Sequence, residues 1–182
     1  QYFADHYHIP PKRLGWAWVG AEQEHFSPGP PRDQQENLRV LFYGSLIPLH
    51  GIEIIAKAAR LTRDAPIKWT IIGRGQQESF LSQLLADEPL PKLEHLTWVP
   101  FQELQNWLHR TDVCLGIFGN SDKASRVIPN KVFQSLCTRT PVITQDSPAM
   151  RELVDEDTPG VYLVPAEDPV ALADVLRRIV HE

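Results

Sequence analysis

Short runs of β-branched and aromatic residues alternate along most of the chain with longer segments whose apolar residues recur at helical spacing. The first such run, residues 39–43, has the composition of a strand. After it, apolar residues recur every three or four positions between Ile52 and Ala59, which predicts a helix of about three turns with one buried stripe. The same alternation continues almost to the end of the chain.

This alternation predicts the fold class. The expected strands are residues 39–43, 68–72, 94–99, 112–118, 141–144 and 161–164. The expected helices are residues 52–59, 76–86, 103–109, 130–137, 148–154 and a last one from 169. Because parallel strands need crossover connections, strict alternation implies a mostly parallel sheet with helices on both faces. We therefore expect an α/β, Rossmann-like, doubly wound sheet of about six strands.

Residues 1–38 differ in character from the rest. They hold a short apolar run at 14–19 and then the proline-dense stretch Ser27-Pro28-Gly29-Pro30-Pro31, which predicts a linker. A chain of 182 residues has room for one substantial core and not for a second full domain. We expect an N-terminal segment and interdomain linker at 1–38 and a single domain at 39–182, with a further domain missing upstream.

Composition narrows the function classes. The chain is 42% hydrophobic and 23% charged, as ordinary globular proteins are. Its formal net charge of -5 argues against a nucleic-acid partner, which would require clustered Lys and Arg. With neither an apolar stretch of transmembrane length nor a signal segment, we expect a cytoplasmic protein. The two cysteines and seven histidines lack metal-ligand spacing, so we expect no metal site.

Ligands of doubly wound sheets bind at the carboxyl ends of the strands, so the loops that follow strands are the candidate sites. The first loop contains Gly44, Ser45 and His50 and could cradle a phosphate, although an ordinary turn is the stronger interpretation of this loop alone. The second loop, Gly73-Arg74-Gly75, has Glu78 in place of the third glycine of a dinucleotide fingerprint, which disfavours a nicotinamide or flavin cofactor. It is either a plain turn or the edge of a binding cleft.

The third loop, residues 119–131, is the most informative one. Pro129 before Asn130 suits a chain that enters a helix, and asparagine is a favoured N-cap. The unpaired N–H groups of that helix start, with Arg126 and Lys131 beside them, would face the carboxyl edge of the sheet and form the best diphosphate site in the chain. The alternative is a solvated polar loop ahead of a capped helix.

The order of these pieces resembles the C-terminal domain of GT-B glycosyltransferases, particularly the retaining enzymes of group 1. The resemblance covers nearly the whole chain and rests on residues 40–46 with His50-Gly51, 69–75, Trp98-Val99-Pro100 with Glu103-Leu104, Asp112-Val113 and 130–144. It implies the donor-binding half of a metal-independent, hexosyltransferase-like enzyme of polysaccharide biosynthesis, with a nucleotide-diphosphate sugar as donor and no cofactor. The acceptor and the catalytic side chain would belong to the missing N-terminal domain, so the isolated chain would bind donor weakly and transfer nothing.

The resemblance also implies roles for individual residues. Seven positions before Pro141 stands Gln134, where the family usually has the second glutamate of its paired-glutamate motif, which is implied to bind the donor ribose. Glutamine keeps an acceptor oxygen for that contact. The nucleobase is implied to lie near residues 73–75 and Trp98-Val99, although Trp98 could equally be a core residue.

Departures from the family pattern indicate a variant branch. Arg126 stands where the first glutamate of the motif is usual, and Ser45 and His50 stand where Arg and Lys commonly neutralise the diphosphate. We expect Arg126 and Lys131, with Lys123, to supply the missing charge. Two other function classes remain: a nucleotide-sugar epimerase, recognised by release of free nucleotide or an altered sugar, and a degenerate binding or assembly module, recognised by failure to bind nucleotide.

Overall fold

The computed structural model describes residues 2–15, 17–33, 35–155 and 157–181. Those residues form a six-stranded sheet of β1 (Leu38–Tyr43), β2 (Ile67–Ile72), β3 (Leu93–Leu96), β4 (Val113–Leu115), β5 (Val142–Gln145) and β6 (Val161–Val164). All paired strands are parallel, and their order is β3-β2-β1-β4-β5-β6. This is the strand order of a doubly wound sheet, so the predicted fold class is confirmed.

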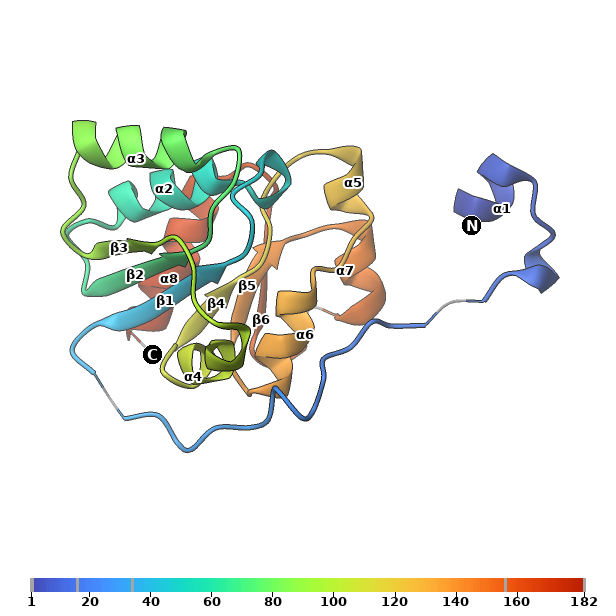
Figure 1. Cartoon of the computed structure of the whole chain (residues 1–182), viewed down its shortest axis with the longest axis horizontal. Coiled ribbons are helices and arrows are strands. Elements are labelled where there is room, and N and C mark those ends of the chain that lie inside the picture. Colours follow the sequence, from blue (N-terminus) through green and yellow to red (C-terminus); the bar gives the residue numbers. More distant parts are fainter. Residues whose placement is uncertain (1, 16, 34, 156, 182) are drawn as a thin grey trace.

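Helices cover both faces of the sheet (Figure 1). They are α2 (Ile52–Leu61), α3 (Glu78–Asp87), α4 (Leu104–His109), α5 (Asp122–Ser125), α6 (Asn130–Cys137), α7 (Pro148–Leu153) and α8 (Pro169–His181), with short 3-10 turns η2 (Pro48–His50) and η3 (Phe101–Glu103). On one face, α2, α3 and α8 pack against the sheet, and on the other α4, α6 and α7 do so. No helix of the described residues combines the length and hydrophobicity needed to cross a bilayer.

Alternating side chains of the central strand build the two halves of the core. In β1, Val40 and Phe42 join the cluster on the α2, α3 and α8 face, while Leu41 and Tyr43 join the cluster under α4. Each fully buried aliphatic or aromatic side chain contributes about 1.5–3 kcal/mol of transfer free energy. Because both faces of the central strands are covered, β1 and β4 are apolar almost throughout, as the sequence pattern had indicated.

Some element ends differ from the prediction. The third strand, expected at 94–99, ends at Leu96, and the fourth, expected at 112–118, ends at Leu115. After β4, the Gly116 N–H still donates to the Ile143 carbonyl (2.8 Å) and the Ile117 carbonyl accepts from the Gln145 N–H (2.9 Å), before the chain enters the loop at the carboxyl edge. The loop expected between strand four and the next helix also contains α5, whose first turn is capped by the Ser121 hydroxyl accepting from the Ala124 N–H (3.1 Å). Serine at that position was the overlooked signal.

The direction of the crossovers reverses between β1 and β4, which is the switch point of this sheet. The loops after these two strands remain joined there by backbone hydrogen bonds. The Phe118 N–H donates to the His50 carbonyl (3.3 Å), and the Gly119 N–H donates to the Leu49 carbonyl (3.2 Å). The two loops at the carboxyl edge of the switch point therefore hold each other in place.

Part of the N-terminal segment packs against the domain. Phe26 is buried in the cluster under α4, and the neighbouring Ser27 N–H donates to the Gln105 side chain (2.7 Å). Arg32 donates to the Arg139 carbonyl (3.0 Å) and to the Thr140 hydroxyl (2.7 Å). Farther upstream, α1 (Tyr2–Tyr7) and η1 (Pro11–Arg13) lie away from the sheet (Figure 1), and position 16 of the predicted apolar run lies outside the described residues. The division at residue 38 stays a prediction.

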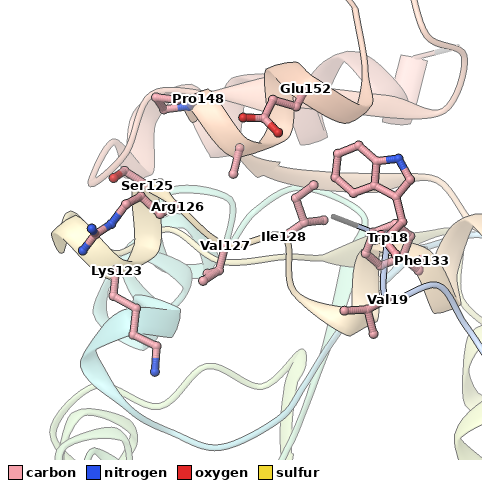
Figure 2. Close-up of a pocket in the computed structure, with 12 residues that line it drawn as sticks. Trp18, Val19, Lys123, Ser125, Arg126, Val127, Ile128, Phe133, Pro148 and Glu152 are labelled. Carbon is pink, nitrogen blue, oxygen red and sulfur yellow. The ribbon is translucent and has the colours of Figure 1, made fainter. Parts of the chain in front are cut away.

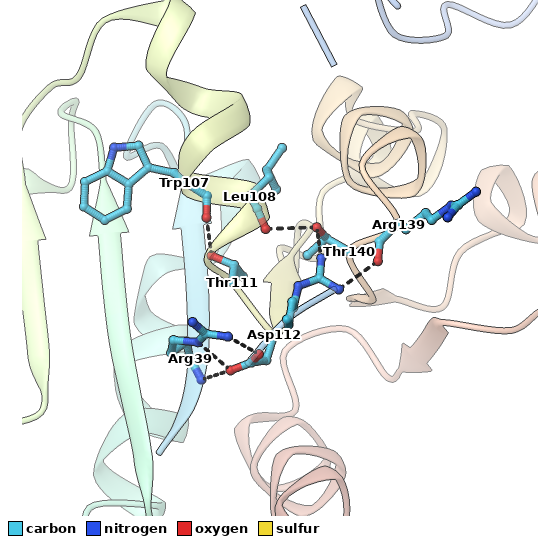
Figure 3. Close-up of polar contacts among 8 residues, drawn as sticks. Arg39, Trp107, Leu108, Thr111, Asp112, Arg139 and Thr140 are labelled. Carbon is cyan, nitrogen blue, oxygen red and sulfur yellow. Dashed lines mark hydrogen bonds and ion pairs between the residues drawn. The ribbon is translucent and has the colours of Figure 1, made fainter. Parts of the chain in front are cut away.

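An ion pair ties β1 to the segment just before β4 (Figure 3). The Asp112 carboxylate accepts from the Arg39 backbone N–H (2.8 Å), from Nε (2.9 Å) and from Nη2 (2.7 Å). Three charge-assisted bonds at one half-buried carboxylate hold the register of the two central strands. The pair lies at the amino edge, opposite the candidate site.

Replacing Asp112 with alanine is expected to lower the free energy of unfolding by about 1–2 kcal/mol, because it leaves Arg39 without its acceptors. The change is measured by urea unfolding followed by circular dichroism. Asp174→Ala is the matched control, since its pair with Arg177 is more exposed and is expected to contribute less than about 0.5 kcal/mol. Equal losses in the two variants would show that the Arg39–Asp112 geometry adds nothing.

Candidate functional site

The loops after β1 and β2 lie against each other through their glycines. Gly44 has a φ of 140° and Gly73 a φ of 143°, conformations that glycine adopts more readily than other residues. The Gly44 N–H donates to the Ile72 carbonyl (2.9 Å), and a Cβ on Gly73 would lie 1.9 Å from the Gly44 carbonyl oxygen. A Cβ on Gly75 would likewise lie 2.7 Å from the Leu46 carbonyl oxygen. The two turns can meet only because these positions lack side chains.

The Lys131 side chain runs from α6 to the underside of the first turn. It is only 6% exposed, and its Nζ lies 3.9 Å from the centroid of the Phe42 ring and 3.5 Å from the Gly116 carbonyl oxygen. A Cβ built on Gly44 would lie 3.1 Å from the same Nζ. Within the described part of the chain, no carboxylate forms an ion pair with this ammonium. The amine of Lys131, which can carry a positive charge, therefore lies directly below Gly44.

His50 belongs to the same cluster. Its Nδ1 is in short contact with the Ser45 carbonyl oxygen, and its ring packs edge-on against Phe42 at 5.7 Å between centroids. Burial, together with the neighbouring Lys131, lowers the pKa of His50 to about 4, and burial lowers the pKa of Lys131 to about 7. At neutral pH the imidazole is thus neutral and donates to Ser45, while the Lys131 amine loses its proton far more readily than an exposed lysine does.

The start of α6 lies at the carboxyl edge, because a crossover helix runs antiparallel to the strands that it connects. The helix begins at Asn130 as predicted, but Pro129 and not Asn130 is the N-cap residue. Pro129 has extended backbone angles, and its carbonyl accepts from the Val132 N–H (2.9 Å). No side chain caps this end, so its first N–H groups are available to an anion.

The structure separates Arg126 from Lys131. Arg126 pairs with Asp122 and lines a pocket of about 560 Å³ whose lining does not include Lys131. Figure 2 shows Arg126 and Lys123 at one end of this pocket and the aromatic rings of Trp18 and Phe133 at the other. The two cations predicted to assist Lys131 therefore belong to a different hollow of the surface.

Gln134 lies inside the protein behind the first turn. Its side chain is 7% exposed, and its Oε1 accepts from the Tyr43 hydroxyl at 2.7 Å. Burial raises the pKa of Tyr43, so this hydroxyl stays a donor. Tyr43 was overlooked because a strand tyrosine between two apolar runs looks like any other core aromatic. Its contact ties β1 to α6 below the candidate site.

A smaller pocket of about 280 Å³ opens between the loops after β1, β2 and β3. Its lining includes Gly44, Ser45, Gly73, Arg74, Trp98 and Val99. Trp98 is 68% exposed, so the alternative that it is a core residue is wrong. Because β3 ends at Leu96, the chain turns outward and presents this indole at the pocket. One hollow beside Gly44 is thus lined by Gly73, Arg74, Trp98 and Val99, which were predicted to surround a nucleobase, whereas Gly75 is not part of its lining.

The described residues contain no group of three or more His, Cys, Asp or Glu side chains that could hold a metal ion. The site consists instead of backbone N–H groups, a buried amine and an exposed indole. These groups suit an anion carried by a flat, partly apolar molecule.

Comparisons with known proteins identify relatives of this domain. Residues 37–182 match the family model described as glycosyl transferases group 1. The WbjE protein of Pseudomonas aeruginosa, named as a probable glycosyltransferase, is 26% identical over 145 residues, which cover 76% of this chain and 34% of WbjE. The chain thus spans about a third of the length of this curated relative.

Solved structures share the fold. The C-terminal domain of the group 1 family protein LpcC from Francisella tularensis superposes with a TM-score of 0.73 and 18% identity, covering 90% of this chain and 89% of that one. Anabaena Alr3699/HepE, solved in complex with UDP and glucose, gives a TM-score of 0.65 and 14% identity, covering 81% of this chain and 39% of that one.

Proposed function

The chain belongs to the group 1 glycosyl transferases, and on that premise we propose that it binds the nucleotide-sugar donor of a two-domain cytoplasmic enzyme whose other domain holds the acceptor. One observation carries the proposal: at the switch point, the uncapped start of α6, the Gly44 turn and the Lys131 ammonium converge. Hydrogen-bond donors and positive charge directed at one edge of the sheet suit a diphosphate.

Transfer of the sugar leaves a nucleoside diphosphate with an added negative charge. Backbone N–H groups and the protonated Lys131 amine, all held in position in the bound state, stabilise that charge without a metal. In this arrangement the base lies in the pocket beside Trp98, and the diphosphate crosses Gly44 toward the start of α6. Gln134 supports the ribose side of the site through its bond with Tyr43.

Isothermal titration calorimetry of the 182-residue chain with UDP-, GDP- and ADP-glucose tests this proposal. We expect one of the three to bind with a dissociation constant between about 10 μM and 1 mM, because in this proposal the acceptor domain would contribute the other side of the cleft. Absence of binding by all three at millimolar concentration would instead indicate a degenerate module.

Trp98→Ala is expected to weaken binding of the preferred nucleotide sugar about 5- to 150-fold, because stacking of a base on an aromatic ring contributes about 1–3 kcal/mol. The thermal midpoint should stay nearly unchanged, since the indole is mostly exposed. Leu61→Ala is the control: Leu61 is also exposed, at 45%, but lies at the end of α2 and should leave affinity unaltered. Equal affinities of Trp98→Ala and the parent chain would remove the indole from the donor site.

A further inference from the structure

Lys131 lies at a buried position where the loss of hydration makes a charged side chain unfavourable. An ammonium that loses its hydration must be compensated by a carboxylate or by several hydrogen bonds. Here its compensation is a single long contact to the Gly116 carbonyl (3.5 Å) and the faces of Phe42 (3.9 Å) and Tyr43 (5.8 Å). Burial in the free protein therefore shifts the equilibrium between ammonium and neutral amine toward the neutral amine, relative to an exposed lysine.

An anion bound above Gly44 would supply the partner that the buried ammonium lacks. Gly44 lines the smaller pocket, and because it has no side chain, only its backbone lies between Lys131 Nζ and that pocket. An anion at this turn would interact with Lys131 through a medium of low dielectric, where attraction between charges is strong. Such an anion would favour the protonated amine.

We propose that Lys131 takes up a proton from the medium when the donor diphosphate binds over Gly44, so that the ligand itself completes the positive charge of its site. The proposal rests on the proposed function, since it assigns a proton to the same diphosphate subsite. The balance is simple: the neutral amine and one proton supplied by the buffer give the ammonium, and no bond of the donor changes.

Three other titratable groups face this amine from the elements packed around it. They are His50 from η2, Tyr43 from β1 and Cys114 from β4. Burial raises the pKa of the Cys114 thiol to about 11 and raises that of Tyr43 as well, so both stay neutral between pH 6 and 8. His50, with its pKa lowered to about 4, also stays neutral there. Lys131 is thus the group of this cluster that titrates near pH 7.

Calorimetry in buffers of different ionisation enthalpy measures the uptake directly. The probe is whichever of UDP-, GDP- or ADP-glucose binds best, because its esterified diphosphate does not titrate near neutral pH. Because the pKa of Lys131 is lowered to about 7 in the free chain, uptake should be a fraction of a proton at pH 7 and should rise toward one proton at pH 8. The nucleoside without its diphosphate should bind without uptake.

Two variants assign the proton. In Lys131→Met, uptake should vanish and affinity should fall about 10- to 100-fold. In His50→Asn, uptake should persist, because His50 is not the group that gains the proton. Binding enthalpies that do not depend on the buffer, or uptake that survives in Lys131→Met, would overturn the inference while leaving donor binding intact. Failure of all three nucleotide sugars to bind would overturn the proposed function and this inference together.

Discussion

Lys131→Met is expected to make the protein more stable and, at the same time, to weaken donor binding. Methionine has nearly the length of lysine and no charge to bury, so at pH 7 the free energy of unfolding should rise by about 1–3 kcal/mol. Binding of the preferred nucleotide sugar should weaken because the cation below Gly44 is lost.

The stability gain should depend on pH in a defined way. The pKa of Lys131 is lowered to about 7 in the folded chain, below its ordinary value of 10.5. Between these values the unfolded state binds more protons than the folded state, so the stability of the parent chain rises with pH. The advantage of Lys131→Met is therefore fully present below about pH 7 and fades as the pH approaches 10.

Urea unfolding of both proteins at pH 6.5, 8 and 9.5 measures this difference, and calorimetry at pH 7 measures affinity. Lys57→Met on α2 is the control, because Lys57 is 51% exposed and far less desolvated. It should change neither the pH dependence nor the affinity. A Lys131→Met protein that is less stable than the parent at every pH, with unaltered affinity, would assign Lys131 a purely structural role.

Gly73→Ala is expected to cost the most stability of any single methyl group added at the site. The new Cβ would lie 1.9 Å from the Gly44 carbonyl oxygen, and the φ of 143° is itself unfavourable for alanine. Backbone atoms cannot yield as a side chain can, so the loops after β1 and β2 must separate. We expect a loss of more than about 3 kcal/mol in the free energy of unfolding, or failure to fold.

Gly160→Ala separates the steric effect from backbone strain. Gly160 has a φ of 75°, but its added Cβ would meet nothing closer than 3.9 Å. It should lose only about 1–2 kcal/mol, as a non-glycine residue in the left-handed region does. Similar losses for the two variants, measured by urea unfolding, would mean that the contact between the two loops is not tight.

The sequence predicted the layout of the sheet because its central strands are buried on both faces. In β1, residues 40–43 are all buried, so both faces had to be apolar and the strand stood out from its surroundings. Strand ends were predicted less well. Residues 116–118 are as buried as β4 itself, but the assigned strand ends at Leu115, although Gly116 and Ile117 still bond to β5 through their backbone; hydrophobicity alone does not locate such an end.

The sequence predicted individual elements of the candidate site, but not how their side chains lie relative to one another. The Gly44 turn and the helix start at Asn130 follow from local rules for glycine and proline. The burial of Lys131 does not, because a lysine in the first turn of a helix is ordinarily exposed. It depends on the space left at the switch point between β1 and β4, which is a property of the whole sheet. The separation of Arg126 has the same origin, since α5 directs it into another pocket.

The central claim is that the donor diphosphate binds over Gly44 at the start of α6. A crystal structure of the chain with the nucleotide sugar that it binds best tests this most directly. The account predicts diphosphate oxygens within hydrogen-bond distance of the first N–H groups of α6 and of the loop after β1, with the base beside Trp98. A diphosphate bound instead in the pocket of Trp18 and Phe133, with the start of α6 untouched, would contradict it.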